Sequence, residues 1–170
     1  MSNPAKQVLL KFFSGHLDRI YCGKQHVINS LPALVDQAHF SDLKLAILEL
    51  RDDVRKQIDR MNEIYGLLGL EQNDEGCVGM TALLREMFDG IDSHKGDKPL
   101  CDLSLIFYLQ NIESIEATSF QMLRLTASKL GNEKVNNLLR ESFDEAKEDR
   151  GLLLQIGKNF LALKGPENKS

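Results

Sequence analysis

Four long segments of this chain carry apolar residues at helical spacing, every third or fourth position. In the third segment Glu116 stands where a core leucine is expected, and Glu113 lies one turn before it. The second and fourth segments place Asp53 and Glu145 in the stripe, whereas the first segment has a glycine there, Gly23. The pattern predicts four amphipathic helices whose buried faces share a polar layer.

Proline, glycine and capping residues predict where these helices begin and end. We expect one helix at about 4–38, with a kink or short break near Ser30 to Leu31, because Pro32 interrupts it. The next is expected at about 41–68, with Ser41 as its N-cap. The remaining helices are expected at about 80–88, 100–129 and 133–163, the last capped by Asn132.

The lengths of the connections predict how the helices pack. Segments one and two are joined by a few residues, and so are segments three and four, so each pair is expected to be antiparallel. A connection of about thirty residues separates the two hairpins. We therefore expect an all-α, ferritin-like antiparallel four-helix bundle with a long crossover that contains a short helix. Residues 1–165 would form one domain, and residues 166–170 a frayed tail.

The acids in the apolar stripes indicate a site. An ionised carboxylate in an apolar seam is costly unless it is paired, protonated or bound to a metal. Carboxylates suit iron or manganese, and bundles can hold two such ions between four helices. The first helix offers only Gly23 at the matching level. The pattern indicates a carboxylate di-metal site that lacks at least one ligand, with these candidates: Asp53, Gln57, Glu113, Glu116 and Glu145.

A simpler interpretation stays open for the same positions. Polar residues in a stripe can lie at its solvated edge or form salt bridges, and Gly23 can allow close contact between helices. Such an arrangement would need no metal. The cations considered as partners are Arg51, Arg55, Arg124, Lys147 and Arg150.

Composition narrows the class of protein. Apolar residues make up 42% of the 170 residues and charged residues 27%, which is ordinary for a soluble globular protein. The net charge of −4, with dispersed lysines and arginines, gives no case for binding nucleic acid or an anionic membrane. No apolar run approaches the roughly 20 residues of a membrane span, and the N-terminus lacks a signal-peptide core. We expect a cytoplasmic protein.

The residues of common catalytic motifs are not found in the sequence. Cys22, Cys77 and Cys101 are odd in number without CxxC spacing, so we interpret them as reduced thiols, and not as a disulfide frame or zinc site. The histidines have no metal-ligand spacing. Neither a glycine-rich phosphate loop nor a nucleophile elbow occurs.

The chain resembles the YciE/YciF family of ferritin-like, stress-associated bacterial proteins from about Leu10 to Leu163. DRIYCGKQHVINSLPALV resembles the family's D-x-x-x-A-E-K-Q-L…L-P-x-L, and LRDDVRKQIDRMNEIY resembles H-L-E-E-T-x-x-H/Q-I-x-R-L. IESIEATSFQMLRLTASKLG resembles V-E-H-Y-E-I-A-x-Y-x-x-L…A-x-x-L-G. LLRESFDEAKEDRGLL resembles L-L-x-x-T-L-x-E-E-K-x-T-D-x-x-L. All four patterns occur in order, which makes the resemblance fairly specific.

The resemblance implies a ferritin-like fold, a homodimer and a metal site built from acids. Glu113 and Glu116 match the family's helix-three glutamates, while Ser114 replaces its histidine. Gly23 replaces the helix-one glutamate, and Ala146 replaces the second glutamate of helix four. The other matched positions are Asp53 for a helix-two glutamate, Gln57 for its His/Gln, and Glu145 for the first helix-four glutamate.

These observations predict a non-enzymatic, stress-associated protein with a degenerate di-metal site. No bound cofactor is expected, since the ligand set is incomplete. The alternative is a functional non-haem di-iron or di-manganese protein that reacts with oxygen or peroxide. Partners other than a second copy, and any substrate, do not follow from the sequence.

Overall fold

The computed structural model describes residues 4–164, which are helical throughout except for short connections. No strand occurs in this range, so the all-α fold is confirmed. None of its helices combines the length and the apolar character that crossing a membrane requires. The elements are α1 (Pro4–Gln37), α2 (Ser41–Leu68), α3 (Cys77–Asp92), α4 (Lys98–Leu130) and α5 (Glu133–Lys164).

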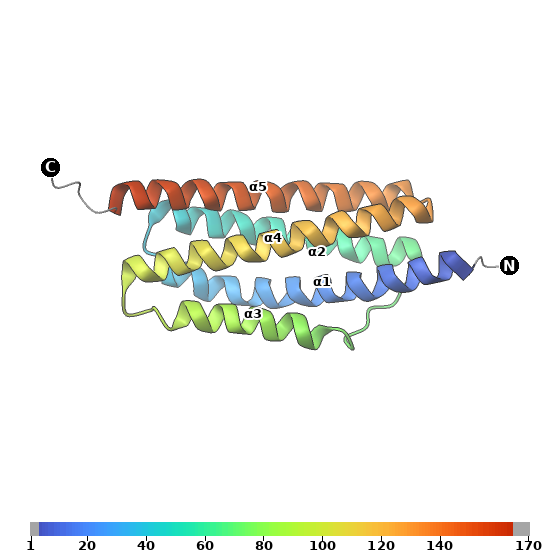
Figure 1. Cartoon of the computed structure of the whole chain (residues 1–170), viewed down its shortest axis with the longest axis horizontal. Coiled ribbons are helices and arrows are strands. Elements are labelled where there is room, and N and C mark those ends of the chain that lie inside the picture. The colour runs from blue at the N-terminus through green and yellow to red at the C-terminus, as the bar shows by residue number, and fades with distance from the viewer. Residues whose placement is uncertain (1–3, 165–170) are drawn as a thin grey trace.

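The four long helices lie side by side, and the short α3 lies along their outside (Figure 1). α1 packs against α2 and α4, and α5 packs against the same two helices, which gives a square arrangement. Each of these neighbouring pairs runs antiparallel in Figure 1. The chain from α2 to α4 returns along the molecule as α3, which packs on α1 and α4. The long crossover therefore contains a short helix, as expected.

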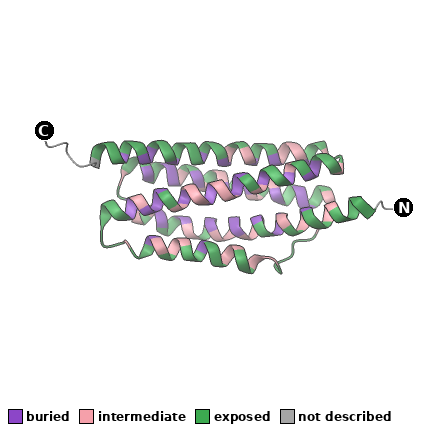
Figure 2. Ribbon diagram, viewed as in Figure 1, coloured by how far each residue is buried: buried purple, intermediate pink, exposed green. Residues whose placement is uncertain are grey.

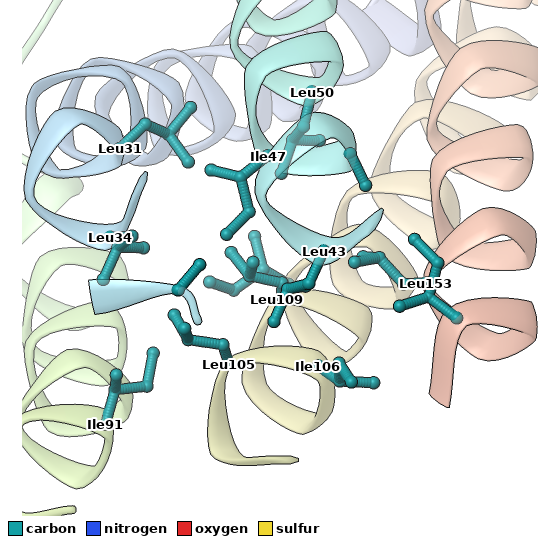
Figure 3. Close-up of a cluster of buried hydrophobic side chains, with 14 of the residues drawn as sticks. Leu31, Leu34, Leu43, Ile47, Leu50, Ile91, Leu105, Ile106, Leu109 and Leu153 are labelled. Atoms are coloured by element: carbon teal, nitrogen blue, oxygen red, sulfur yellow. The ribbon is translucent and has the colours of Figure 1, made fainter. Parts of the chain in front are cut away.

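The interior consists of two apolar clusters, one toward each end of the long helices. Figure 2 shows that buried residues follow the facing sides of these helices. Figure 3 shows part of the larger cluster, where Leu43, Leu109 and Leu153 from three helices approach one another. The smaller cluster gathers around Phe13 and Phe120. Burial of these faces is the main driving force that holds the helices together.

The ends of the helices follow their local sequence. Gly69 and Gly131 end α2 and α4 in the left-handed conformation, with φ of 61° and 75°, which glycine adopts without steric cost. The expected cap at Asn132 is confirmed, because its Oδ1 accepts a bond of 3.1 Å from the Val135 N–H. The cap expected at Ser41 is wrong by one residue, since Ser41 begins α2 and Phe40 holds the cap position.

Two further expectations concern Pro32 and the C-terminal tail. α1 continues through Pro32 to Gln37, so no break occurs there. Leu31 and Leu34, on either side of Pro32, are buried in the core, and this packing offsets the backbone hydrogen bond that a proline cannot donate. The tail expected at residues 166–170 lies outside the described residues.

The interpretation of the cysteines is wrong for two of the three. Cys22 of α1 and Cys77 of α3 form a disulfide, with Cα atoms 5.7 Å apart, whereas Cys101 is free and buried. The two partners are separated by 55 residues in sequence. They meet only because the crossover brings the start of α3 alongside α1, which no cysteine spacing motif could reveal.

Candidate functional site

A layer of polar side chains crosses the bundle between the two apolar clusters. On every long helix it interrupts a stripe that belongs to one cluster before the layer and to the other cluster after it. Lys24 lies between Ile20 and Val27 on α1, Gln57 between Val54 and Met61 on α2, Glu113 and Glu116 between Ile112 and Phe120 on α4, and Glu145 and Asp149 between Leu139 and Leu153 on α5.

Lys24 is the centre of this layer. Its side chain has no solvent exposure, and its Nζ donates to Oε2 of Glu116, which is 7% exposed. The ammonium also lies 5.8 Å from the centroid of the Phe120 ring. Burial by itself lowers the pKa of Lys24, but the charges of Glu116, Glu113 and Asp149 outweigh burial and raise it. The layer therefore holds a protonated lysine.

Glu113 is the most isolated acid of the layer. It is fully buried, and neither carboxylate oxygen has a hydrogen-bond partner among the described residues. Burial raises its pKa well above the usual value, and the charge of Glu116 raises it further, while Lys24 acts in the opposite direction. This buried environment therefore favours the neutral form of Glu113.

Asp149 is a second acid with an incomplete set of partners. It is 6% exposed, and its Oδ2 has no hydrogen-bond partner in the described part of the chain. Burial and the neighbouring charge of Asp53 raise the pKa of Asp149 to about 7, against the effect of Lys24. Asp149 therefore changes its charge in the physiological pH range.

The remaining acids are held at the edge of the layer by cations. Arg60 donates two hydrogen bonds to Glu145, of 2.6 Å to Oε2 and 2.7 Å to Oε1. The amide of Gln57, which is fully buried, donates to Glu145 Oε2 at 3.2 Å. Asp53 accepts a bond of 2.7 Å from Lys56, one turn along α2. Both acids are thus already neutralised by partners on α2.

The structure brings together most of the predicted residues. Glu113 and Glu116 lie beside Lys24, and Gln57 contacts Glu145, whereas Asp53 is turned toward Lys56 at the rim. Gly23 faces α3, because a Cβ built on it would lie 3.1 Å from Met80 Cγ and 3.7 Å from Leu84 Cδ1. Gly23 therefore allows α3 to approach α1 closely.

Sequence reasoning missed the cations of the layer. Lys24 continues the spacing of Ile20, Val27 and Leu31 better than Gly23 does, and this was the available signal. Arg60 was missed as well, and Asp149 was not among the candidate ligands. The cations considered from the sequence lie elsewhere: Arg51 and Arg55 pair with Asp52, and Arg124 and Lys147 lie near the Phe143 ring.

The layer offers two kinds of chemistry. One ammonium faces three acids, and the raised pKa values of two of them favour their protonated forms. The unpartnered oxygens of Glu113 and Asp149 could also bind a cation. A di-metal ligand set does not fit these residues, because Lys24 pairs with Glu116, Arg60 holds Glu145, and Gly23 supplies no ligand.

Comparison with known proteins adds the family. The sequence profile of DUF892, a domain of unknown function, matches residues 8–162. Protein YciF of Escherichia coli (strain K12) is 26% identical over 155 residues, which covers 91% of this chain and 92% of that protein. The crystal structure of the E. coli stress protein YciF matches with a TM-score of 0.82 at 21% identity, covering 92% of this chain and 98% of that chain. YcfI of Rhodopseudomonas palustris matches with a TM-score of 0.80 at 22% identity, covering 91% and 98%.

Proposed function

This chain belongs to the DUF892 family, as its resemblance to YciE/YciF proteins predicted, and we propose that it is a non-enzymatic, stress-associated member. In this proposal the fold is a ferritin-like four-helix bundle, and the polar layer is a degenerate di-metal site. In this proposal the Lys24 ammonium takes the place of a metal cation. The stress association is suggested by the description of the E. coli relative as a stress protein.

The single observation that carries this proposal is the ion pair between Lys24 and Glu116. A cluster of buried carboxylates needs positive charge, because desolvating several anions together costs many kcal/mol. Lys24 supplies that charge from within the chain. The raised pKa values of Glu113 and Asp149 reduce the remaining negative charge. In this proposal the layer therefore needs no external cation.

The second candidate is a working non-haem iron or manganese protein that reacts with oxygen or peroxide. It is favoured by the three buried carboxylate oxygens of Glu113 and Asp149 that have no hydrogen-bond partner among the described residues. Against it stands the same ammonium, which repels a metal cation and uses one oxygen of Glu116. We therefore place it second.

Elemental analysis of protein purified without chelator distinguishes the two candidates. The proposal expects far less than one iron or manganese per chain in the wild type. It also expects Lys24→Met, which removes the cation but keeps the acids, to gain more thermal stability from added Mn²⁺ or anaerobic Fe²⁺ than the wild type gains. Lys56→Met is the matched control, because Lys56 pairs with Asp53 at the exposed rim. About two metal atoms per wild-type chain would overturn the proposal.

Location and assembly complete the proposal. We place the protein in the cytoplasm, as a homodimer that binds neither nucleic acid nor membranes. The net charge of −4 supports the last two points. In a reducing cytoplasm the Cys22–Cys77 disulfide would be reversible, not a permanent staple.

A further inference from the structure

The Cys22–Cys77 disulfide ties the first residue of the crossover helix α3 to the middle of α1. Both cysteines are only partly buried, which leaves part of each residue open to solvent. Cys101 is buried and has no disulfide partner. The accessible pair and the inaccessible thiol therefore differ in the chemistry open to them.

Apart from the disulfide, Met80 packs the start of α3 on Gly23, but no residue of α3 before Leu84 is buried. Within the described range, the buried residues of α3 are Leu84 and Ile91, while Val78 is 78% exposed. The far end of α3 has a polar tie as well, because Asp92 accepts a bond of 2.9 Å from Gln37 of α1. Loss of the disulfide would therefore affect the start of α3 more than its end.

The start of α3 also covers the polar layer. Met80 and Leu84 form one wall of a cavity of about 10 Å³ between α1, α3 and α4. Gly23 lies across this cavity, and Glu116, the partner of Lys24, lines it too. Movement of the first turns of α3 away from Gly23 would open a path for water to the buried ion pair.

We propose that Cys22 and Cys77 form a reversible thiol–disulfide modification site that controls the docking of the first turns of α3. In reduction, a thiolate of a dithiol attacks one sulfur, and the S–S bond breaks to give a mixed disulfide and one cysteine thiol. The second thiol of the reductant then displaces the other cysteine, which leaves two protein thiols and an oxidised dithiol.

Hydrogen peroxide can reverse this change. One cysteine thiolate attacks peroxide and becomes a sulfenic acid with loss of water, after proton transfer. The other thiol then condenses with the sulfenic acid, which forms the S–S bond and releases a second water. The site thus links the position of α3 to the balance of dithiol and peroxide.

Zinc binding is a rival use of the reduced pair. The carboxylate of Asp74 and the two sulfur atoms offer ligand atoms within 4.8 Å of one another. Two thiolates and one carboxylate are a set that Zn²⁺ accepts in proteins. The exposed position of Asp74 and the bond between the sulfur atoms favour the thiol–disulfide exchange. The test must nevertheless separate the two.

Hydrogen exchange of the full chain, followed by mass spectrometry, tests the proposal. The protein is treated with peroxide or with dithiothreitol, each with and without added Zn²⁺, and alkylation counts the free thiols. Reduction should free two additional thiols and accelerate exchange of amides 78–84 by on the order of tenfold or more. Exchange in α5 should not change. Added Zn²⁺ should not change the acceleration of exchange at amides 78–84 that reduction causes.

Matched variants make the result specific. Cys22→Ser should exchange at the start of α3 like the reduced wild type, with or without peroxide. Cys101→Ser should respond like the wild type, because it keeps the pair. The proposal is overturned if peroxide leaves all three thiols free to alkylate after unfolding. It is also overturned if exchange is equal in both redox states, or if only zinc and its chelator change it.

Discussion

Lys24 shows how a charged side chain can be stable in a bundle interior. Its Nζ has Glu116 as a direct partner, and Glu113 and Asp149 add attraction at longer range when they are ionised. The four methylene groups of lysine also fill space next to the aromatic ring of Phe120. The buried ammonium is therefore stable, because without it Glu116 would be buried without a cation.

We predict that Lys24→Met lowers the free energy of unfolding by about 3–5 kcal/mol, because it leaves Glu116 buried without its cation. Denaturant unfolding at pH 7 measures the loss. The double variant Lys24→Met/Glu116→Gln should recover much of it, since both charges are then removed. A double variant no more stable than Lys24→Met alone would show that the ion pair does not explain the loss.

Asp149 predicts a pH dependence. Its pKa is about 7 in the folded protein against about 3.9 in the unfolded chain, so the folded state binds the proton more tightly. Wild-type stability is therefore lost from this group as pH rises between these values, by at most about 4 kcal/mol. An asparagine at this position does not titrate, so Asp149→Asn should not lose this stability as pH rises.

The variant Asp149→Asn should accordingly gain stability relative to the wild type as pH rises from 4 to 8. Unfolding curves at several pH values measure the difference. Asp144→Asn is the control, because Asp144 is exposed on the same helix. A stability difference between Asp149→Asn and the wild type that does not change with pH would contradict the raised pKa.

At the scale of single residues, the sequence predicted which acids lie in the polar layer better than it predicted their cationic partners. Glu113 and Glu116 interrupt an apolar stripe, which periodicity alone reveals. Lys24 was missed because the neighbouring Gly23 aligned with a family glutamate. That alignment indicated a missing ligand, and not a buried cation. Gly23 and Lys24 are both buried, but Gly23 faces α3 while Lys24 pairs with Glu116, and the sequence does not reveal where α3 packs.

The crossover helix depends on two glycines that differ in their surroundings. A Cβ at Gly79 would meet no atom within 4 Å, whereas a Cβ at Gly90 would lie 2.7 Å from the hydroxyl oxygen of Tyr108. Gly79→Ala should therefore stabilise the protein by up to about 1 kcal/mol through helix propensity. Gly90→Ala should destabilise it, because the Tyr108 ring must move.

Thermal unfolding of these two variants measures the opposite signs. The double variant Gly90→Ala/Tyr108→Leu tests the cause, since a leucine removes the ring that an alanine Cβ would meet. Gly90→Ala should therefore lower the free energy of unfolding less in the Tyr108→Leu background than in the wild type. Equal effects of alanine at both glycines would mean that α3 does not pack on α4 at this point.

The elements themselves were largely predictable, because long periodic stripes and glycine stops act locally. The exceptions are tertiary. Pro32 predicts a break by its own chemistry, but the burial of Leu31 and Leu34 keeps α1 continuous. The Cys22–Cys77 bond depends on where the crossover places α3, and cysteine spacing carries no information about that.

The connectivity of the whole molecule was predictable from loop lengths. Two short joints and one long crossover leave few ways to pair four helices, and the observed neighbours are among them. Assembly is different, because it depends on which surface atoms complement a second copy. The family resemblance alone implies a homodimer.

We predict that light scattering at micromolar concentration gives twice the 19.2 kDa mass of one chain. Exposed apolar side chains such as Phe107 and Leu125 on α4 offer surface for an isologous contact. Dithiothreitol should not dissociate this dimer, because Cys22 and Cys77 pair within one chain and Cys101 is buried. The midpoint of thermal unfolding should also rise with protein concentration, since association stabilises the folded state by mass action. A mass of 19.2 kDa with a midpoint that does not depend on concentration would show a monomer.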